Sequence, residues 1–196
     1  RFRDEHISDN LITWTPAWNE ALREDRHIFT ACATWSVKFS IESSDPQQKN
    51  LGRWGLMSAP EGNANLGGTS MGITKTCKDK RLAWEFLKFA TLSTEGARTL
   101  NSMGLMTTAK KPYEEDPSLK SYKSRWFGNQ DLGIYYMDHI IPSIKTRTLT
   151  SQDGVIHECL WMILNALNRD GNLSSEEAEE LLREELQKEL KDITVY

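Results

Sequence analysis

The sequence is poor in cysteine and in long apolar runs. Its 196 residues contain three cysteines, which are too few and too widely spaced for a disulfide scaffold or a zinc ribbon. Apolar residues adjoin Cys32 and Cys159, and we expect buried and unreactive thiols at Cys32, Cys77 and Cys159. The longest apolar runs, such as Ile28–Ala33, are far shorter than the roughly 20 residues that a membrane helix needs.

The chain also lacks an excess of positively charged residues. The chain carries 24 Lys and Arg against 28 Asp and Glu, which gives a formal net charge of −4, and it has no basic stripe. A mildly acidic chain of this kind is a poor candidate for nucleic-acid binding, so we expect no nucleic-acid partner. Residues 1–5 contain neither an initiator methionine nor the apolar segment of a signal peptide, and we expect a mature piece or an internal fragment.

Short motifs for catalysis are absent too. The chain has no Gly-x-Ser-x-Gly elbow, Walker loop, dinucleotide fingerprint or Cys/His pairing. His157 and Cys159 do not have the spacing of a metal-binding pair on a helix. We therefore expect no catalytic residue, no cofactor and no metal. A carbohydrate-active hydrolase stays open as the alternative, because two carboxylates far apart along the chain leave no short motif.

The sequence does contain strong helical periodicity. Apolar residues recur at helical spacing in several segments, and capping residues precede some of them. Thr15-Pro16 is a cap followed by a proline at the first helical position, and Thr76–Asp79 and Ser174–Glu177 resemble capping boxes. The predicted helices lie at about 16–25, 35–41, 77–92, 94–103, 118–124, 131–141 and 155–169, and a last helix follows Ser174.

Three other segments predict short strands. They are residues 27–34, which are rich in β-branched and small residues, residues 54–59, which end at Pro60, and residues 69–74. The glycine-rich stretch 61–68 predicts an irregular turn between the second and third strands. These strands argue against a purely helical interaction domain, which is a third hypothesis for the chain.

The order of these segments resembles a known family. Trp54–Pro60 leads into Gly67–Thr74, and Lys80–Phe89 and Ser93–Gly96 follow. This is similar to family 1 extracellular solute-binding proteins of bacterial ABC transporters, the relatives of maltose-binding protein. There, a strand ending in Pro precedes a Gly-Gly turn, a strand ending near Ile and an Ala-Trp-Glu-Phe-Leu-Lys-Phe helix. The resemblance continues in Ala31–Trp35, in Trp126–Asp131 and in the ending from Gly171 to Ala178.

The resemblance implies an α/β fold. It implies the carboxy-terminal portion of a periplasmic-binding-protein-like (type II) two-lobe fold, helix-rich with short strands. Residues 1–56 and 116–196 are then segments of the C-lobe, and residues 57–115 are the returning segment of the N-lobe. The first N-lobe segment is not in this chain, so we expect the 196 residues alone to bind ligand weakly or not at all.

The resemblance also implies a binding role without catalysis. The protein would be the substrate-binding component of an ABC importer, which holds a sugar or an oligosaccharide between its lobes and delivers it to the membrane permease by hinge closure. Its expected partners are therefore a carbohydrate ligand and the permease subunits, and the expected state is a monomer. The expected location is extracytoplasmic, either periplasmic or as a membrane-anchored lipoprotein.

Three tryptophans are candidate ligand contacts. Sugars present flat patches of C–H groups that an aromatic ring can cover. Trp35 matches the cleft tryptophan of the family, Trp126 lies in a family-like segment, and Trp161 lies off the apolar stripe of its helix. The alternatives are a core aromatic for Trp35, a structural wedge for Trp126 and a cap on another element for Trp161.

The turn formed by Gly67, Gly68, Thr69 and Ser70 is the candidate polar contact. Glycines let a ligand approach backbone N–H groups, and the two hydroxyls can pair with those of a sugar. The alternative is a tight turn at the start of a strand. The sequence thus predicts a site of three tryptophans and one polar turn.

Overall fold

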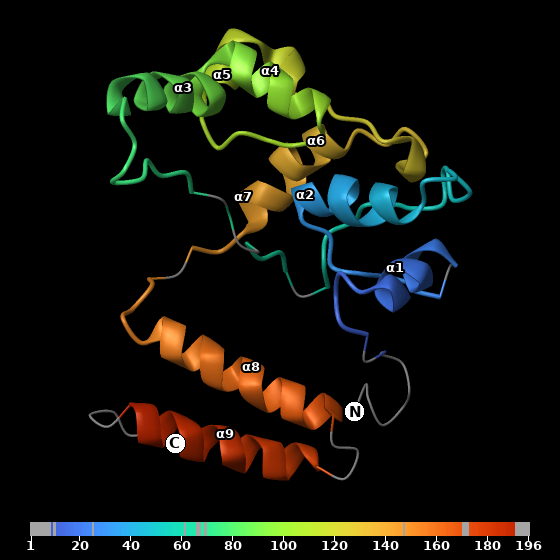
Figure 1. The fold of residues 1–196 in the computed structure, drawn as a ribbon. Helices are drawn as coiled ribbons and strands as arrows, with labels where there is room; N and C mark the ends of the chain where they lie inside the picture. The colour runs from blue at the N-terminus through green and yellow to red at the C-terminus, as the bar shows by residue number, and fades with distance from the viewer. Residues whose placement is uncertain are drawn as a thin grey trace. The chain divides into compact units, whose positions relative to one another are not determined.

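The computed structural model describes residues 9, 11–24, 26–60, 62–65, 68, 70–146, 148–169 and 173–190. The chain divides into two units, one formed by Thr13–Lys145 and the other by Arg1–Ile12 together with Thr146–Tyr196 (Figure 1). Helices dominate both units, as the sequence predicts. Within the described ranges, no helix has both the length and the apolar character required to cross a membrane.

The larger unit is a series of short helices. Its α-helices are α1 (Pro16–Arg23), α2 (Thr34–Ser36), α3 (Lys80–Leu92), α4 (Thr94–Ser102), α5 (Lys111–Glu115), α6 (Leu132–Tyr135) and α7 (Ile141–Ser143). Two π-helical segments, η1 (Val37–Glu42) and η4 (Tyr136–Ile140), continue α2 and α6. Two 3-10 turns are η2 (Pro117–Lys120) and η3 (Arg125–Phe127).

Side-chain caps set where several helices begin. The Thr15 hydroxyl accepts a hydrogen bond from the Trp18 backbone N–H at 3.3 Å, and Pro16 occupies the first helical position, as predicted. The predicted start of α3 at the Thr76 box is wrong. The carboxylate of Asp79 is the cap instead and accepts from the Leu82 N–H at 2.8 Å. The Thr76 hydroxyl lies 3.3 Å from the Thr74 hydroxyl, and this local hydrogen bond takes the place of a helix cap at Thr76.

Two helical predictions in the middle of the chain need correction. The segment predicted as a helix at 118–124 forms only the 3-10 turn η2, and Tyr122 uses its backbone for long-range contacts instead. The helix predicted over 131–141 runs as α6, η4 and α7, and it continues past Pro142 to Ser143. Pro142 stands in the first turn of α7, where a missing backbone N–H costs little.

The predicted strands at 27–34 and 54–59, and the described part of the one at 69–74, are not formed. Among the described residues the β-pairing is one isolated bridge, between Lys123 and Asp131. A strand requires a neighbouring chain for its backbone N–H and C=O groups, and local propensity does not provide one. Segment 27–33 runs without a ladder into α2, with the side chains of Ile28 and Phe29 98% and 85% exposed.

Backbone carbonyls and then side chains take the place of a partner strand along residues 52–58. The backbone N–H groups of Gly52 and Trp54 donate to the carbonyls of Arg125 and Trp126 at 2.9 and 3.0 Å. Beyond them, the Gln130 side-chain amide accepts from the Leu56 N–H at 2.8 Å and donates to the Leu56 carbonyl at 2.9 Å. The Tyr135 hydroxyl then accepts from the Ser58 N–H at 3.1 Å. The segment is therefore held in place without belonging to a sheet.

The core of the larger unit lies where the two π-helical segments meet this extended segment. Its buried members are Val37, Ile41, Leu56, Phe127, Leu132, Tyr136 and Ile140. The Tyr136 hydroxyl donates to the Cys32 carbonyl at 2.8 Å, which ties the chain just before α2 to this core. Gly133, the second residue of α6, lies so close to η2 that a Cβ there would overlap with the Lys120 carbonyl oxygen.

A buried carboxylate organises the loop that follows η1. Asp45 is 1% exposed and accepts hydrogen bonds from the backbone N–H groups of Lys49 and Asn50 at 3.0 and 2.8 Å. It also accepts from the indole N–H of Trp126 at 3.1 Å. Burial alone would raise the pKa of Asp45, but these hydrogen bonds and the charge of Lys49 outweigh it and hold the pKa below its usual value.

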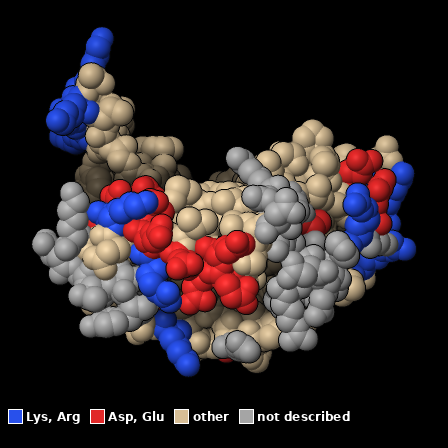
Figure 2. All heavy atoms as spheres, turned by 90° about the horizontal axis from the view of Figure 1, so that it is seen from below, with Lys and Arg blue, Asp and Glu red and all other residues tan. Residues whose placement is uncertain are grey.

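The described part of the smaller unit is a helical hairpin of α8 (Asp153–Arg169) and α9 (Ser175–Glu189). Cys159 and Ile163 of α8 and Ala178 of α9 are buried in it. The predicted capping box is confirmed, because Ser174 and Glu177 each accept a hydrogen bond from the other's backbone N–H. Figure 2 shows Asp and Glu side chains gathered in one stretch of the surface.

The cysteines do not form disulfides. All three are free, but only Cys159 is buried, whereas Cys32 and Cys77 are half-buried. Burial raises the pKa of the Cys32 and Cys159 thiols, so both are protonated and unreactive at neutral pH, as expected.

We predict that Gly133→Ala destabilises the larger unit by about 2 kcal/mol, because the added methyl group collides with backbone that has little room to move. Gly72→Ala is the matched control, since a Cβ at Gly72 meets no atom within 4 Å. Urea unfolding followed by circular dichroism measures both variants. Equal midpoints for the two would contradict the packing described for α6.

We predict that Asp45→Asn lowers the free energy of unfolding at neutral pH by roughly 1–3 kcal/mol, because a neutral amide cannot accept from all three donors. The folded-state pKa of Asp45 is lowered, so its contribution is fully present above about pH 4 and is lost as the pH falls through the folded-state value. Stability of the wild type should therefore fall more steeply in acid than that of the variant.

The control for this substitution is Asp79→Asn. Asparagine caps a helix as well as aspartate does, so stability should change little. If the free energy of unfolding depends on pH in the same way for the wild type and Asp45→Asn, the carboxylate does not stabilise the loop.

Candidate functional site

Trp35 lies in a cluster of three tryptophans in the larger unit, which we call the Trp cluster: Trp14, Trp18 and Trp35. The rings of Trp14 and Trp35 are stacked, with centroids 5.7 Å apart and planes at 24°. The rings of Trp14 and Trp18 have the same centroid separation and are tilted by 49°. Trp14 is 53% exposed, and Trp18 and Trp35 are half-buried. The cluster therefore presents aromatic surface to solvent.

Local structure places each of the three rings. Trp35 stands in the first turn of α2, which begins where the Ser36 N–H donates to the Ala33 carbonyl at 2.9 Å. Trp18 is in the first turn of α1, and Trp14 directly precedes the Thr15 cap. A contact between an apolar residue just before a cap and one in the first turn is similar to a hydrophobic staple, which sets the angle at which the chain enters the helix.

The backbone of Trp14 is in an unusual conformation. Its φ is 70°, in the left-handed region that bulky side chains rarely adopt. This conformation costs on the order of 1 kcal/mol, so its surroundings must hold it there. The ring contacts with Trp18 and Trp35 are two interactions that hold the residue in this position.

Trp126 is engaged by the protein on two sides. Its indole N–H donates to Asp45, and its half-buried ring packs against the core cluster. These contacts are those of a wedge between the loop after η1 and the core, which was the alternative interpretation of this residue. The sequence could not show that Asp45 would lie beside it.

Trp161 belongs to the smaller unit. It lies on α8 with 62% of its surface exposed, and its backbone carbonyl accepts from the Asn165 side chain at 2.8 Å. Cys159 and Ile163 face α9 instead, so Trp161 is indeed off the apolar stripe that packs the hairpin.

The predicted polar turn is described only in part. Gly68 and Ser70 are exposed, whereas Gly67 and Thr69 lie outside the described residues. Apart from Trp35 itself, none of the predicted site residues that the structure describes belongs to the Trp cluster. The residues that do join it, Trp14 and Trp18, were not predicted. The sequence Trp14-Thr15-Pro16-Ala17-Trp18 carries the signal for their contact with each other, but none for their contact with Trp35.

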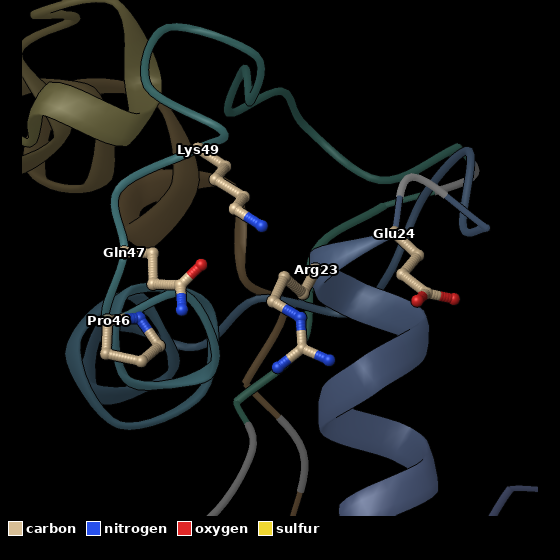
Figure 3. Close-up of a pocket in the computed structure, with 5 residues that line it drawn as sticks. All are labelled: Arg23, Glu24, Pro46, Gln47 and Lys49. Carbon is tan, nitrogen blue, oxygen red and sulfur yellow. The ribbon is translucent and has the colours of Figure 1, made fainter.

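A shallow pocket of about 370 Å³ lies beside the end of α1. Arg23 lines it from the last position of α1 and Glu24 from the position directly after it, and Pro46, Gln47 and Lys49 line it from the loop after η1 (Figure 3). All but Arg23 are exposed, and Arg23 pairs with Glu20 at 3.8 Å. None of the predicted ligand residues lines this pocket. Among the described residues, no group of three or more His, Cys, Asp and Glu side chains is arranged to hold a metal ion.

Comparison with known proteins identifies the family. The sequence model of the bacterial extracellular solute-binding proteins matches residues 5–125, a range that includes all three residues of the Trp cluster. No curated protein and no solved structure matches the chain. The predicted resemblance to solute-binding proteins is confirmed by the match. Because it covers more than half of the 196 residues, this chain belongs to the family of bacterial extracellular solute-binding proteins, which bind their solutes outside the cytoplasm.

Proposed function

We propose that this protein is the substrate-binding component of an ABC importer and that its ligand is a sugar or an oligosaccharide. The observation that carries the proposal is the Trp cluster, which offers half-exposed aromatic surface in a chain of the solute-binding family. Flat indole rings match the C–H faces of sugar rings and contribute about 1 kcal/mol each beyond the area that they bury. Trp35 is the ring that we assign to the ligand.

Polar groups from the turn after Pro60 would complete the site. Gly68 and Ser70 are exposed and carry no side chain larger than a hydroxymethyl group, so a ligand can reach their backbone. We include Gly67 and Thr69 in this proposal on the sequence pattern alone. Trp126 and Trp161 are further proposed contacts, Trp126 through the part of its ring that stays exposed and Trp161 through its largely exposed ring.

In this proposal, ligand binding closes two lobes. Residues 57–115 belong to the N-lobe, and residues 1–56 and 116–196 belong to the C-lobe. Hinge bending encloses the ligand, and the closed form is recognised by the permease in the membrane. The binding energy is used for closure and not for a transition state. The protein acts as a monomer and needs no cofactor.

The hydrolase alternative receives no support from the described carboxylates. A glycoside hydrolase needs one carboxylic acid whose pKa is raised, so that it is protonated when it donates to the leaving group. Burial alone would raise the pKa of Asp45 and Asp131, but hydrogen bonds to each carboxylate outweigh it and lower the pKa. Both groups are engaged in holding loops, Asp131 by accepting from Ser121 and the Tyr122 N–H.

We predict that Trp35→Ala weakens sugar binding about tenfold, because it removes the stacking surface together with the area that the ring buries against the ligand. Titration calorimetry on the full-length protein measures this with maltose, maltotriose, cellobiose and xylobiose. Trp84→Ala is the matched control, since Trp84 is 53% exposed on α3, outside the Trp cluster, and its loss should leave affinity unchanged.

Two results would overturn the proposal. Failure of the wild type to bind any sugar of a broad panel would exclude a carbohydrate as the ligand. Equal affinity of wild type and Trp35→Ala would exclude Trp35 as a contact, provided that both unfold at the same temperature.

A further inference from the structure

Trp14 covers a face of Trp35. The two indoles are stacked with ring centroids 5.7 Å apart and planes at 24°, so the part of Trp35 beneath Trp14 is closed to any other flat molecule. A sugar that stacks on this face needs the same position, because stacked partners of an aromatic ring lie within a few ångströms of its face. Trp14 and a stacked ligand therefore exclude each other on this face.

Trp14 is also held in a conformation that it would leave readily. Its φ of 70° is disfavoured for a tryptophan, and one of the contacts that hold it is the stack on Trp35 itself. The residue stands at the beginning of the larger unit, directly after Thr13 and before the Thr15 cap. Rotation about its backbone can swing the ring away while Pro16–Arg23 stays helical, because the cap hydrogen bond starts at Thr15.

We propose that Trp14 is a displaceable cover that determines which ligands reach Trp35. A sugar with a flat C–H face replaces the Trp14 ring on Trp35, and the released Trp14 backbone returns to an ordinary conformation. The inference rests on the proposed function, in which Trp35 stacks on a sugar. It adds a competition step, since the ligand gains on Trp35 only the difference between its own stacking and that of the indole.

This cover has a consequence for specificity. Sugars whose hydroxyls interrupt both faces stack weakly on an aromatic ring and cannot displace the indole. Removal of the ring should therefore raise the affinity for sugars that stack on Trp35 and leave the affinity for sugars that do not stack there unchanged.

The test compares Trp14→Gly with the wild type in calorimetry on the full-length protein with maltose, maltotriose, cellobiose and xylobiose. Glycine keeps the backbone conformation with positive φ accessible and removes the ring. We expect the affinity to rise about fivefold, which corresponds to the loss of one competing aromatic stack. Trp84→Ala serves again as the control for the loss of a half-exposed tryptophan.

A second measurement uses the wild type, so that it does not depend on how a variant folds. Stacked indoles give an exciton couplet in the far-ultraviolet circular dichroism spectrum. Saturation with a bound sugar should remove the part of this couplet that Trp14→Gly removes in the absence of ligand.

The outcomes separate this inference from the proposed function. Weaker or unchanged binding by Trp14→Gly, with the wild type still binding sugar, would show that Trp14 is itself a ligand contact or is irrelevant, and would overturn the cover alone. A couplet that persists at saturation would do the same. No sugar binding by either protein would overturn the proposed function, and the cover with it.

Discussion

The side chain of Gln130 makes the contact on which much of the larger unit depends. Its amide forms both hydrogen bonds that a neighbouring strand would give to Leu56. This pairing satisfies the backbone of an apolar segment that has no ladder, and it lets Leu56 pack beside Phe127 and Leu132 in the core. Without this pairing, Leu56 would place an unpaired backbone N–H and C=O next to buried apolar surface.

The same core positions the aromatic surface. Tyr136 is buried in the core and donates to the Cys32 carbonyl, which fixes the chain three residues before Trp35. Trp35 is thereby presented at the start of α2, where Trp14 reaches it from the segment before α1. Packing within the larger unit, Thr13–Lys145, thus determines where Trp35 lies. Displacement of the Trp14 ring need not disturb that packing.

Membership of the solute-binding family and the structure of the Trp cluster support one interpretation. Such proteins bind and release, so their contacts must be strong enough to hold a solute and weak enough to let it go. An aromatic ring that already has a partner meets this requirement, because the ligand gains only the difference between two stacks. In the proposed cover, the indole that competes with the ligand lowers the affinity for ligands that stack on Trp35.

Much of the local structure could be predicted from the sequence. The caps at Thr15 and Ser174, the end of α4 before Gly104 and the apolar stripe of α8 depend on residues within one or two turns of each other. The family could be predicted too, since it rests on an ordered series of motifs along the chain. Trp35 was selected as a candidate ligand contact in this way, because its motif is local.

Tertiary structure determined the features that need a contact between residues far apart in the sequence. The segments 27–33 and 54–59 have strand propensity, but a strand exists only where another chain segment pairs with it, and side chains of Gln130 and Tyr135 took that role along residues 56–58. Trp126 became a wedge because Asp45 lies beside it. Propensity and capping act between near neighbours, so the sequence by itself determined the longer helices α3, α4, α8 and α9. The stacking of Trp14 on Trp35 joins residues on different elements, and only the packing of those elements determines it.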